Sequence, residues 1–189
     1  MNFLDSVMAF EPYDEITSNL KQEFINIYNK YGNEIFDRDN KLFHVTSSSI
    51  ILNKECTKML MIYHNLYRNY GWQGGHNDSD PDCLRVAIKE AREETSLPDF
   101  QVNDKVYSLD ILPVFEHYKK GKYVNSHLHL NLTYVFIADE SSPIKIKEDE
   151  NSDIRWVNIS DLDNLVNEPE MLKLYKRVIK KYKEDLCHF

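Results

Sequence analysis

The 189-residue chain is long enough for one domain with a sizeable core, since 42% of its residues are hydrophobic and 29% are charged. Its net charge of −8 argues against a nucleic-acid backbone as the main partner, because such sites need clustered lysines and arginines. The sequence shows no long apolar run, no secretory signal and only three widely spaced cysteines. These features predict a soluble cytoplasmic protein without a membrane partner, a disulfide framework or a cysteine zinc motif.

The first part of the chain predicts a helix followed by two strands. Apolar residues at helical spacing over residues 13–31 predict a helix within an N-terminal extension, residues 1–40, that packs on the core. Residues 41–53 and 58–67 are strand-like, and the short turn between them predicts an antiparallel hairpin. The TSSS run at residues 46–49 is unusual for the middle of a strand, so it is either a polar sheet face or a row of hydroxyls beside a ligand.

The second part predicts more strands and a closing helix. Residues 105–118 and 123–138 form predicted strands joined by a hairpin turn, and Pro113 in the first of them indicates a sheet edge or a bulge. Residues 153–159 predict a last strand. Residues 170–186 carry an apolar stripe and predict a C-terminal helix.

The most informative stretch is residues 72–97, WQGGHNDSDPDCLRVAIKEAREETSL. Two adjacent glycines precede an acidic turn and a helix predicted over residues 82–95. Within that helix Glu90, Glu93 and Glu94 lie at i, i+3 and i+4, so they gather on one face. Their repulsion costs roughly 0.2–0.5 kcal/mol per pair, and a hard divalent cation such as Mg²⁺ offsets it by binding carboxylate oxygens.

This stretch resembles the Nudix box, GX5EX7REUXEEXGU, in which U is an aliphatic residue. Gly75 matches the first glycine, residues 89–94 (KEAREE) match REUXEE, and Leu97 matches the final aliphatic position. A glutamate run alone is commonly a solvated helix face, but its spacing from the two glycines favours the box. The first glutamate, the arginine and the late glycine of the pattern are replaced by Pro81, Lys89 and Ser96.

The resemblance implies a fold and an activity. The fold is an α+β sandwich, with a mixed sheet between helices in a single domain over residues 41–189. The activity is hydrolysis of a pyrophosphate bond in a small phosphorylated substrate, a nucleoside diphosphate linked to another moiety. Mg²⁺ or Mn²⁺ is implied as cofactor, held by Glu90, Glu93, Glu94 and the carbonyl of Gly74. A homodimer is a plausible assembly.

The three departures from the box leave an alternative open. In the family the arginine and the first glutamate brace the loop, so the departures affect loop geometry and rate more than metal binding. They also favour the alternative of a catalytically weak or inactive ligand-binding module. A third activity, isomerisation of an isoprenoid diphosphate, needs a cysteine and glutamate pair that the sequence does not place.

Many members of the family use a further acid outside the box as a base or an extra metal ligand. Each candidate in this chain can equally be an exposed surface acid, and the sequence does not choose among them. The candidates are Glu116, Asp149, Glu150 and Asp153.

The strand predicted over residues 123–138 has a polar and an apolar face. Asn125, His127, His129 and Asn131 share one face by alternation, while leucines occupy the other face and must pack on the core. We predict that the polar face lines the substrate pocket beside the metal helix, against the alternative of a plain polar sheet face. Two histidines at i, i+2 can bind Zn or Cu, but no cysteine or third histidine lies beside them in the sequence. Trp72 is expected to stack on a substrate ring or to lie in the core.

Overall fold

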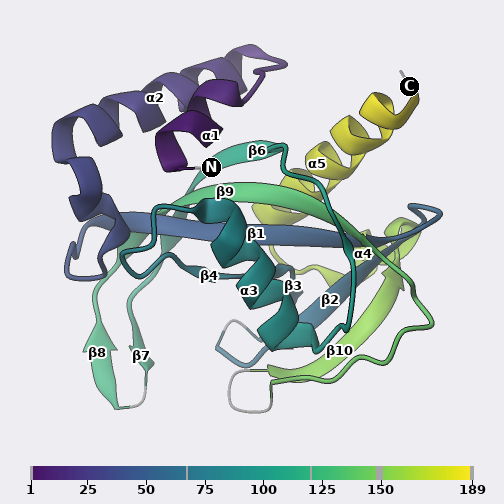
Figure 1. Cartoon of the computed structure of the whole chain (residues 1–189). Helices are drawn as coiled ribbons and strands as arrows, with labels where there is room; N and C mark the ends of the chain where they lie inside the picture. Colours follow the sequence, from purple (N-terminus) through teal and green to yellow (C-terminus); the bar gives the residue numbers. More distant parts are fainter. Residues whose placement is uncertain (1, 67, 120, 148–150, 188–189) are drawn as a thin grey trace.

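A mixed sheet forms the centre of the fold in the computed structural model, which describes residues 2–66, 68–119, 121–147 and 151–187 (Figure 1). The sheet has the main order β10 (Asn151–Asn158), β2 (Lys58–His64), β1 (Phe43–Asn53), β9 (His127–Ala138) and β5 (Gln101–Val102). Three shorter or outer strands pair beside this path, namely β3 (Asn69–Gly71) with β2, β4 (Gln73–His76) with β1 and β6 (Ser108–Val114) with β9.

The parallel pair of β1 and β9 is the middle of the sheet. The pairing runs from Phe43 opposite Leu128 to Asn53 opposite Ala138. Every residue of β1 after Phe43 is buried, so both faces of this strand are covered. The antiparallel pairing of β1 with β2 confirms the predicted hairpin.

The strands predicted over 105–118 and 123–138 are shorter in the structure. β6 ends at Val114, and β9 begins at His127. Between them β7 (His117–Lys119) and β8 (Lys122–Val124) form a separate antiparallel arm that projects from the sheet (Figure 1). Among the described strands β6 pairs with β9 alone, which confirms the edge position indicated by Pro113.

Helices cover both faces of the sheet. They are α1 (Phe3–Ala9), α2 (Glu15–Tyr31), α3 (Cys83–Thr95), α4 (Leu162–Leu165) and α5 (Pro169–Cys187), with short 3₁₀ turns at Gly32–Phe36 and Ile159–Asp161. In Figure 1, α3 crosses in front of the central strands β1 and β9. Helices α1 and α2 lie at the upper left next to β6, and α5 lies at the upper right. No helix in the described part of the chain is both long enough and apolar enough to span a membrane.

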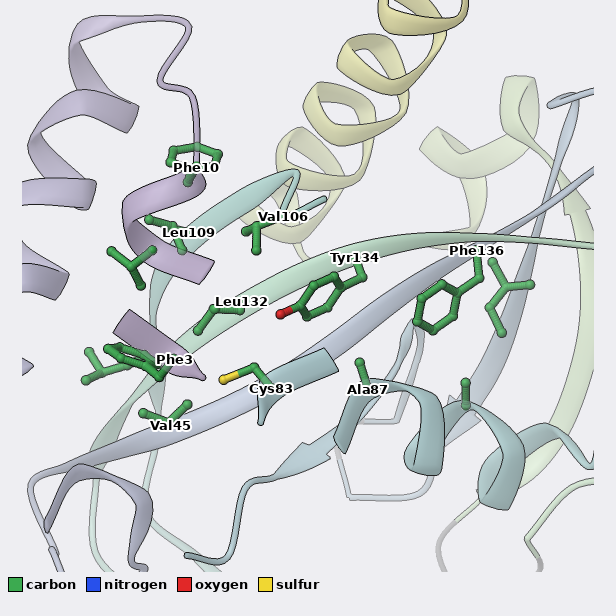
Figure 2. Close-up of a cluster of buried hydrophobic side chains, with 14 of the residues drawn as sticks. Phe3, Phe10, Val45, Cys83, Ala87, Val106, Leu109, Leu132, Tyr134 and Phe136 are labelled. Carbon is green, nitrogen blue, oxygen red and sulfur yellow. The ribbon is translucent and has the colours of Figure 1, made fainter. Parts of the chain in front are cut away.

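A hydrophobic cluster joins α1 and α3 to one face of the sheet. Phe3 of α1 and Cys83 of α3 lie beside Val45 and Leu132 of the central strands, as Figure 2 shows. Tyr134, fully buried, continues the same face. Helix α1 was not predicted from the sequence. It holds the N-terminus against the core, while the division of the chain at residue 40 stays a prediction.

The opposite face packs on the C-terminal helix. Buried side chains of β1 and β2 meet the apolar stripe of α5 in a second cluster, which includes Ile50, Leu52, Met59, Met61, Leu174, Tyr175 and Val178. The sheet is therefore a layer between helices. This is the α+β sandwich expected from the sequence.

Candidate active site

The two glycines lie where β4 runs beside β1. Ser47 pairs with Gly75, and Ser48 pairs with Gly74. A β-carbon on Gly75 would lie 2.5 Å from Cδ of Glu90, and one on Gly74 would lie 2.9 Å from the Ser47 carbonyl oxygen. Only glycine allows such close approaches, so the glycine pair brings backbone directly against the acidic helix.

Helix α3 carries the carboxylates. It begins after Asp82, whose side chain accepts a hydrogen bond from the Arg85 backbone N–H at 3.1 Å, as a helix N-cap does. Val86, Ala87 and Ala91 are buried and fix which face of the helix meets the sheet. The predicted helix over residues 82–95 is confirmed.

The three glutamates of α3 differ in burial. The side chain of Glu93 is 43% exposed and that of Glu90 is 14% exposed, while Glu94 is buried. Glu94 Oε2 accepts a hydrogen bond of 2.9 Å from the Gly74 backbone N–H. Burial raises the pKa of Glu90, and nearby Lys89 acts in the opposite direction. The carboxylates thus form a row from Glu94, buried against the glycine strand, to Glu93, which reaches solvent.

Lysines balance this acidic face. Lys89 Nζ lies 3.4 Å from Glu90 Oε1 and 3.9 Å from Glu93 Oε1. Lys147 Nζ lies 3.7 Å from Glu93 Oε2. Lys89 stands at the box arginine position, and its ammonium is directed to the glutamates.

The site fits a hard divalent cation. Carboxylate oxygens are the donors that Mg²⁺ and Mn²⁺ prefer, and the carboxylate of Glu90 fills the space that a side chain on residue 75 would occupy. Glu90, Glu93 and Glu94 are the residues that would hold the ion, beside the backbone of Gly74. The role of the Gly74 carbonyl as a ligand stays a prediction.

Asn77 braces the turn between β4 and α3. Its side-chain oxygen accepts a hydrogen bond of 2.8 Å from Ser47 Oγ. Its amide donates to the Asp80 carbonyl at 2.7 Å and approaches Cys83 Sγ at 3.4 Å. No local sequence pattern singles out Asn77, because its role depends on contacts with β1 and with the start of α3.

An ion pair adds to this bracing. Arg85 donates two hydrogen bonds to the Asp80 carboxylate, at 2.9 and 2.6 Å. This pair spans the position of Pro81, where the box has its first glutamate. Contacts around Asn77 and Asp80 therefore hold a turn that lacks the glutamate and arginine of the family pattern.

The backbone conformation of Ser96 explains why the box pattern has a glycine at this position. Its φ and ψ are 53° and 21°, the left-handed region, and its N–H donates to the Arg92 carbonyl at 2.9 Å. This is how a glycine ends a helix, and a serine there is strained.

The candidate acids outside the box have other partners. Glu116 accepts a hydrogen bond of 2.6 Å from Ser126 Oγ beside the β7–β8 arm. Asp153 on β10 accepts hydrogen bonds from Tyr70 and Arg155. Asp149 and Glu150 lie outside the described residues. A role of any of these acids as base or extra ligand stays a prediction.

Trp72 belongs to the second hydrophobic cluster. It is 9% exposed, and its ring meets that of Tyr175 at a centroid distance of 5.4 Å. Its carbonyl oxygen lies 3.0 Å from His64 Nε2. This placement favours the core interpretation that the sequence left open, and it gives no support to stacking on a substrate.

Asn131 is the centre of a buried polar network. It is 1% exposed, and its oxygen accepts hydrogen bonds from Thr46 Oγ1 at 2.9 Å and Ser48 Oγ at 2.8 Å. Its amide donates to Thr133 Oγ1 at 3.0 Å. The structure therefore places Asn131 in the interior and not on a ligand-accessible surface. The hydroxyls of the TSSS run are likewise buried.

The polar face of β9 lies on the side of the sheet away from the acidic helix. Leu130 and Leu132 pack in the cluster that contains Ala87 and Ala91 of α3. Alternation was predicted correctly, but the core helix on the leucine side is the box helix itself. The polar face therefore does not lie beside the metal helix as predicted, and its role in lining a substrate pocket stays a prediction.

Two further histidines lie next to His127 and His129. His44 pairs with His129 across the parallel strands, and His76 on β4 lies opposite Thr46 of β1. One ligand atom from each of these four histidines lies within 4.8 Å of the others. The sequence argument that no third histidine accompanies the pair is wrong, because His44 and His76 join it only through strand pairing.

A hollow of about 780 Å³ lies beside the turn that precedes α3. Its lining includes Ser79 and Pro81 of that turn, together with the acids Glu34, Asp37 and Asp39. These acids would repel a pyrophosphate. The hollow is therefore a poor candidate for the phosphate-binding part of the site.

A glycine strand and a glutamate helix on a sheet between helices define a Nudix-type fold, and comparison with known proteins agrees. The family model described as NUDIX domain matches residues 42–180. The chain belongs to the NUDIX family. No curated protein matches it.

Solved structures share the fold at low identity. An Ap4A hydrolase of C. elegans in a binary complex is 17% identical, with 77% of this chain and 98% of that chain covered and a TM-score of 0.55. The NUDIX domain of Shewanella oneidensis NrtR complexed with ADP ribose is 14% identical, with coverage of 73% and 87% and a TM-score of 0.52. The E. coli dihydroneopterin triphosphate pyrophosphohydrolase is 13% identical, with coverage of 73% and 93% and a TM-score of 0.52.

Proposed function

We propose that the protein hydrolyses a pyrophosphate bond in a nucleoside diphosphate linked to another moiety, with Mg²⁺ or Mn²⁺ as cofactor. The observation that carries the proposal is the meeting of Gly74 and Gly75 with the glutamates of α3. Glu94 accepts the Gly74 N–H at 2.9 Å, and Glu90 fills the space beside Gly75. This arrangement holds a carboxylate set against open backbone, which suits a cation and its phosphate ligand.

The chemistry divides between the ion and the chain. A divalent cation supplies charge neutralisation and polarises the phosphoryl group. Glu90 and Glu93 would hold the ion through their carboxylates, and the Gly74 N–H orients Glu94. The glycines leave room for the phosphates, and Asn77 and Asp80 keep the turn in place.

Lys89 has a second role in this proposal. Its ammonium offsets the repulsion between Glu90 and Glu93. Its side chain is 58% exposed, so a cation that took over this role would leave Lys89 able to turn toward a phosphate oxygen.

Names of structural neighbours suggest which substrates to try. They refer to Ap4A, ADP ribose and dihydroneopterin triphosphate, all of which contain linked phosphates. We propose a small phosphorylated molecule of this class as substrate, acted on in the cytoplasm, by a monomer or a homodimer.

A substrate panel with a matched variant pair tests the proposal. The purified chain is incubated with Mg²⁺ or Mn²⁺ and with dinucleoside polyphosphates, ADP ribose, nucleotide sugars and nucleoside triphosphates, and phosphate is measured after phosphatase coupling. We expect turnover of at least one substrate and a loss of about a hundredfold or more in Glu93→Gln, because an anionic ligand is removed. Glu170→Gln removes the same charge from an exposed position on α5 and should leave the rate unchanged. Equal rates in the two variants would contradict the assignment.

A ligand-binding module without catalysis is the second candidate function. The pairing of Lys89 with Glu90 and Glu93 favours it, because an ammonium beside these carboxylates competes with a cation for them. Calorimetry that detects nucleotide binding, with no product formed on the same panel over hours, would support this function and exclude the first.

A further inference from the structure

We propose that His44, His76, His127 and His129 form a binding site for one transition-metal cation of the Zn²⁺ class, separate from the glutamates of α3. The four imidazoles come from β1, β4 and β9, so segments far apart in the sequence converge on one point. Their ring centroids lie 4.8 Å apart for His44 with His76 or His127, 4.9 Å for His76 with His129, and 5.1 Å for His129 with His44 or His127.

Backbone contacts orient two of the rings for ligation. His44 Nδ1 lies 3.3 Å from the Asn40 carbonyl oxygen, and His127 Nδ1 lies 2.8 Å from the Asn125 carbonyl oxygen. An Nδ1–H that donates to a carbonyl leaves Nε2 as the lone-pair nitrogen, which is the usual outer-shell arrangement of metal-binding histidines.

A buried nitrogen without a hydrogen bond marks the centre of the cluster. His44 is only 5% exposed, and its Nε2 is buried with no hydrogen-bond partner among the described residues. Leaving such an atom unsatisfied costs roughly 1–3 kcal/mol. A cation among the rings would use this lone pair.

The spacing suits a tetrahedral ion after a small contraction. His127 Nε2 and His129 Nε2 lie 3.2 Å apart in a hydrogen bond. With the His127 Nε2 lone pair as acceptor, the proton is on His129 Nε2, and it moves to His129 Nδ1 or to solvent when a cation binds both nitrogens. Zn–N bonds of about 2.0–2.1 Å place neighbouring ligands of a tetrahedron about 3.3–3.4 Å apart. The remaining ligand atoms, which lie within 4.8 Å of one another, must move inward. Three of the four rings are only half-buried, so they border solvent, and small side-chain shifts are enough for this contraction.

The hydrogen bonds of the rings favour a cation over an anion as ligand. His44 and His127 direct Nδ1 at backbone carbonyl oxygens, so their Nε2 atoms carry lone pairs. Such lone pairs bind a cation and offer no donor to a phosphate oxygen. The nearby guanidinium of Arg38 is paired with the Asp78 carboxylate, so its charge is largely offset.

The donor set selects the class of cation. Four imidazole nitrogens suit Zn²⁺, Co²⁺, Ni²⁺ or Cu²⁺, whereas Mg²⁺ and Mn²⁺ prefer oxygen. A cation at this site would fasten β4 to β1 and β9. His76 follows Gly75 directly, so the ion would also steady the glycine strand from the opposite face of the sheet.

Metal binding by the tag-free full chain tests the proposal. The protein is stripped with a chelator, and Zn²⁺ affinity is measured against a competing chromophoric chelator, with Co²⁺ as an optical probe of geometry. We expect one equivalent of Zn²⁺ per chain, a tetrahedral Co²⁺ spectrum and a higher melting temperature with Zn²⁺, because an ion that binds only the folded state stabilises it.

Matched variants separate this site from other sites. His127→Ala and His76→Ala should weaken Zn²⁺ binding at least about a hundredfold and abolish the thermal shift, since loss of an outer-shell contact alone costs 10–100-fold. His117→Ala, a histidine on the β7–β8 arm outside the cluster, and Glu93→Gln should bind as the wild type does. His127→Gln serves as the conservative variant if His127→Ala does not fold.

Three outcomes would overturn the proposal. They are a wild-type chain that binds no Zn²⁺, histidine variants with unchanged affinity, and binding that is lost in Glu93→Gln but kept in His127→Ala. None of these readouts uses hydrolysis, so the proposal stands or falls independently of the hydrolase activity.

Discussion

Replacement of Ser96 by glycine should stabilise the protein. Ser96 is exposed and ends α3 with φ 53°, a left-handed conformation that costs an L-residue roughly 1–2 kcal/mol. Glycine removes this strain but gains freedom in the unfolded chain, which costs about 0.4–1 kcal/mol. The net gain is therefore about 0.5–1 kcal/mol, or about 1–4 °C in melting temperature for a chain of this size. Chemical denaturation and calorimetry measure both quantities.

The same serine-to-glycine change at another position should lower the stability of the protein. Ser18 is an exposed residue inside α2 and is not among the described residues with positive φ. Ser18→Gly should destabilise the protein by a few tenths to about 1 kcal/mol, because glycine is a poor residue in a helix interior. If Ser96→Gly lowered the stability as much as Ser18→Gly does, the argument from the left-handed helix end would be refuted.

Further changes test the glycine strand and an ion pair between sheet and helix, in which Arg177 of α5 donates a hydrogen bond to the buried carboxylate of Asp110 on β6. Gly75→Ala should push the Glu90 carboxylate away and lower Mg²⁺ affinity and turnover at least about tenfold with little loss of stability, whereas Gly74→Ala meets backbone and should destabilise by about 1–3 kcal/mol. Calorimetry measures Mg²⁺ binding and thermal melts measure stability. If Gly75 did not lie against Glu90, the two variants would not differ in this way. Asp110→Asn removes the negative charge that pairs with Arg177, which then keeps only neutral partners such as Ser108, and should cost about 2–4 kcal/mol. The double change Asp110→Leu with Arg177→Met should recover most of that loss in urea unfolding. No recovery in the double variant would argue against an electrostatic cause.

Patterns within short stretches of sequence were enough to predict most of the helices and strands. The helix of the box was predicted over residues 82–95 and is Cys83–Thr95, with Asp82 as its cap. The prediction succeeded because a cap residue and an apolar stripe are both recognisable within a few neighbouring residues. The helix predicted over 170–186 is Pro169–Cys187 for the same reason. In contrast, β4 was not predicted, since its Gln73–His76 has neither β-branched residues nor alternation and becomes a strand only by pairing with β1.

The site shows the same division between local and long-range information. Glu90, Glu93 and Glu94 share a helix, so their spacing alone placed them together. His44 and His129 are paired by the register of two parallel strands, and no local pattern encodes that register. Alternation predicted which residues of β9 share a face. Which helix covers each face depends on the order and direction of the strands in the sheet, which alternation does not reveal.

The parallel pairing of β1 with β9 has a consequence for how the protein reaches its fold. Partners such as Thr46 and Asn131 are 85 residues apart in the chain. Closing so long a loop is entropically costly before any contact repays it, and parallel pairing of this kind slows folding. During synthesis β2 and β4 become available to one edge of β1 well before β9, so the backbone N–H and C=O groups of its other edge stay unpaired until β9 emerges. We expect the sheet to close late and in one cooperative step, with the box helix settling onto β9 at that moment.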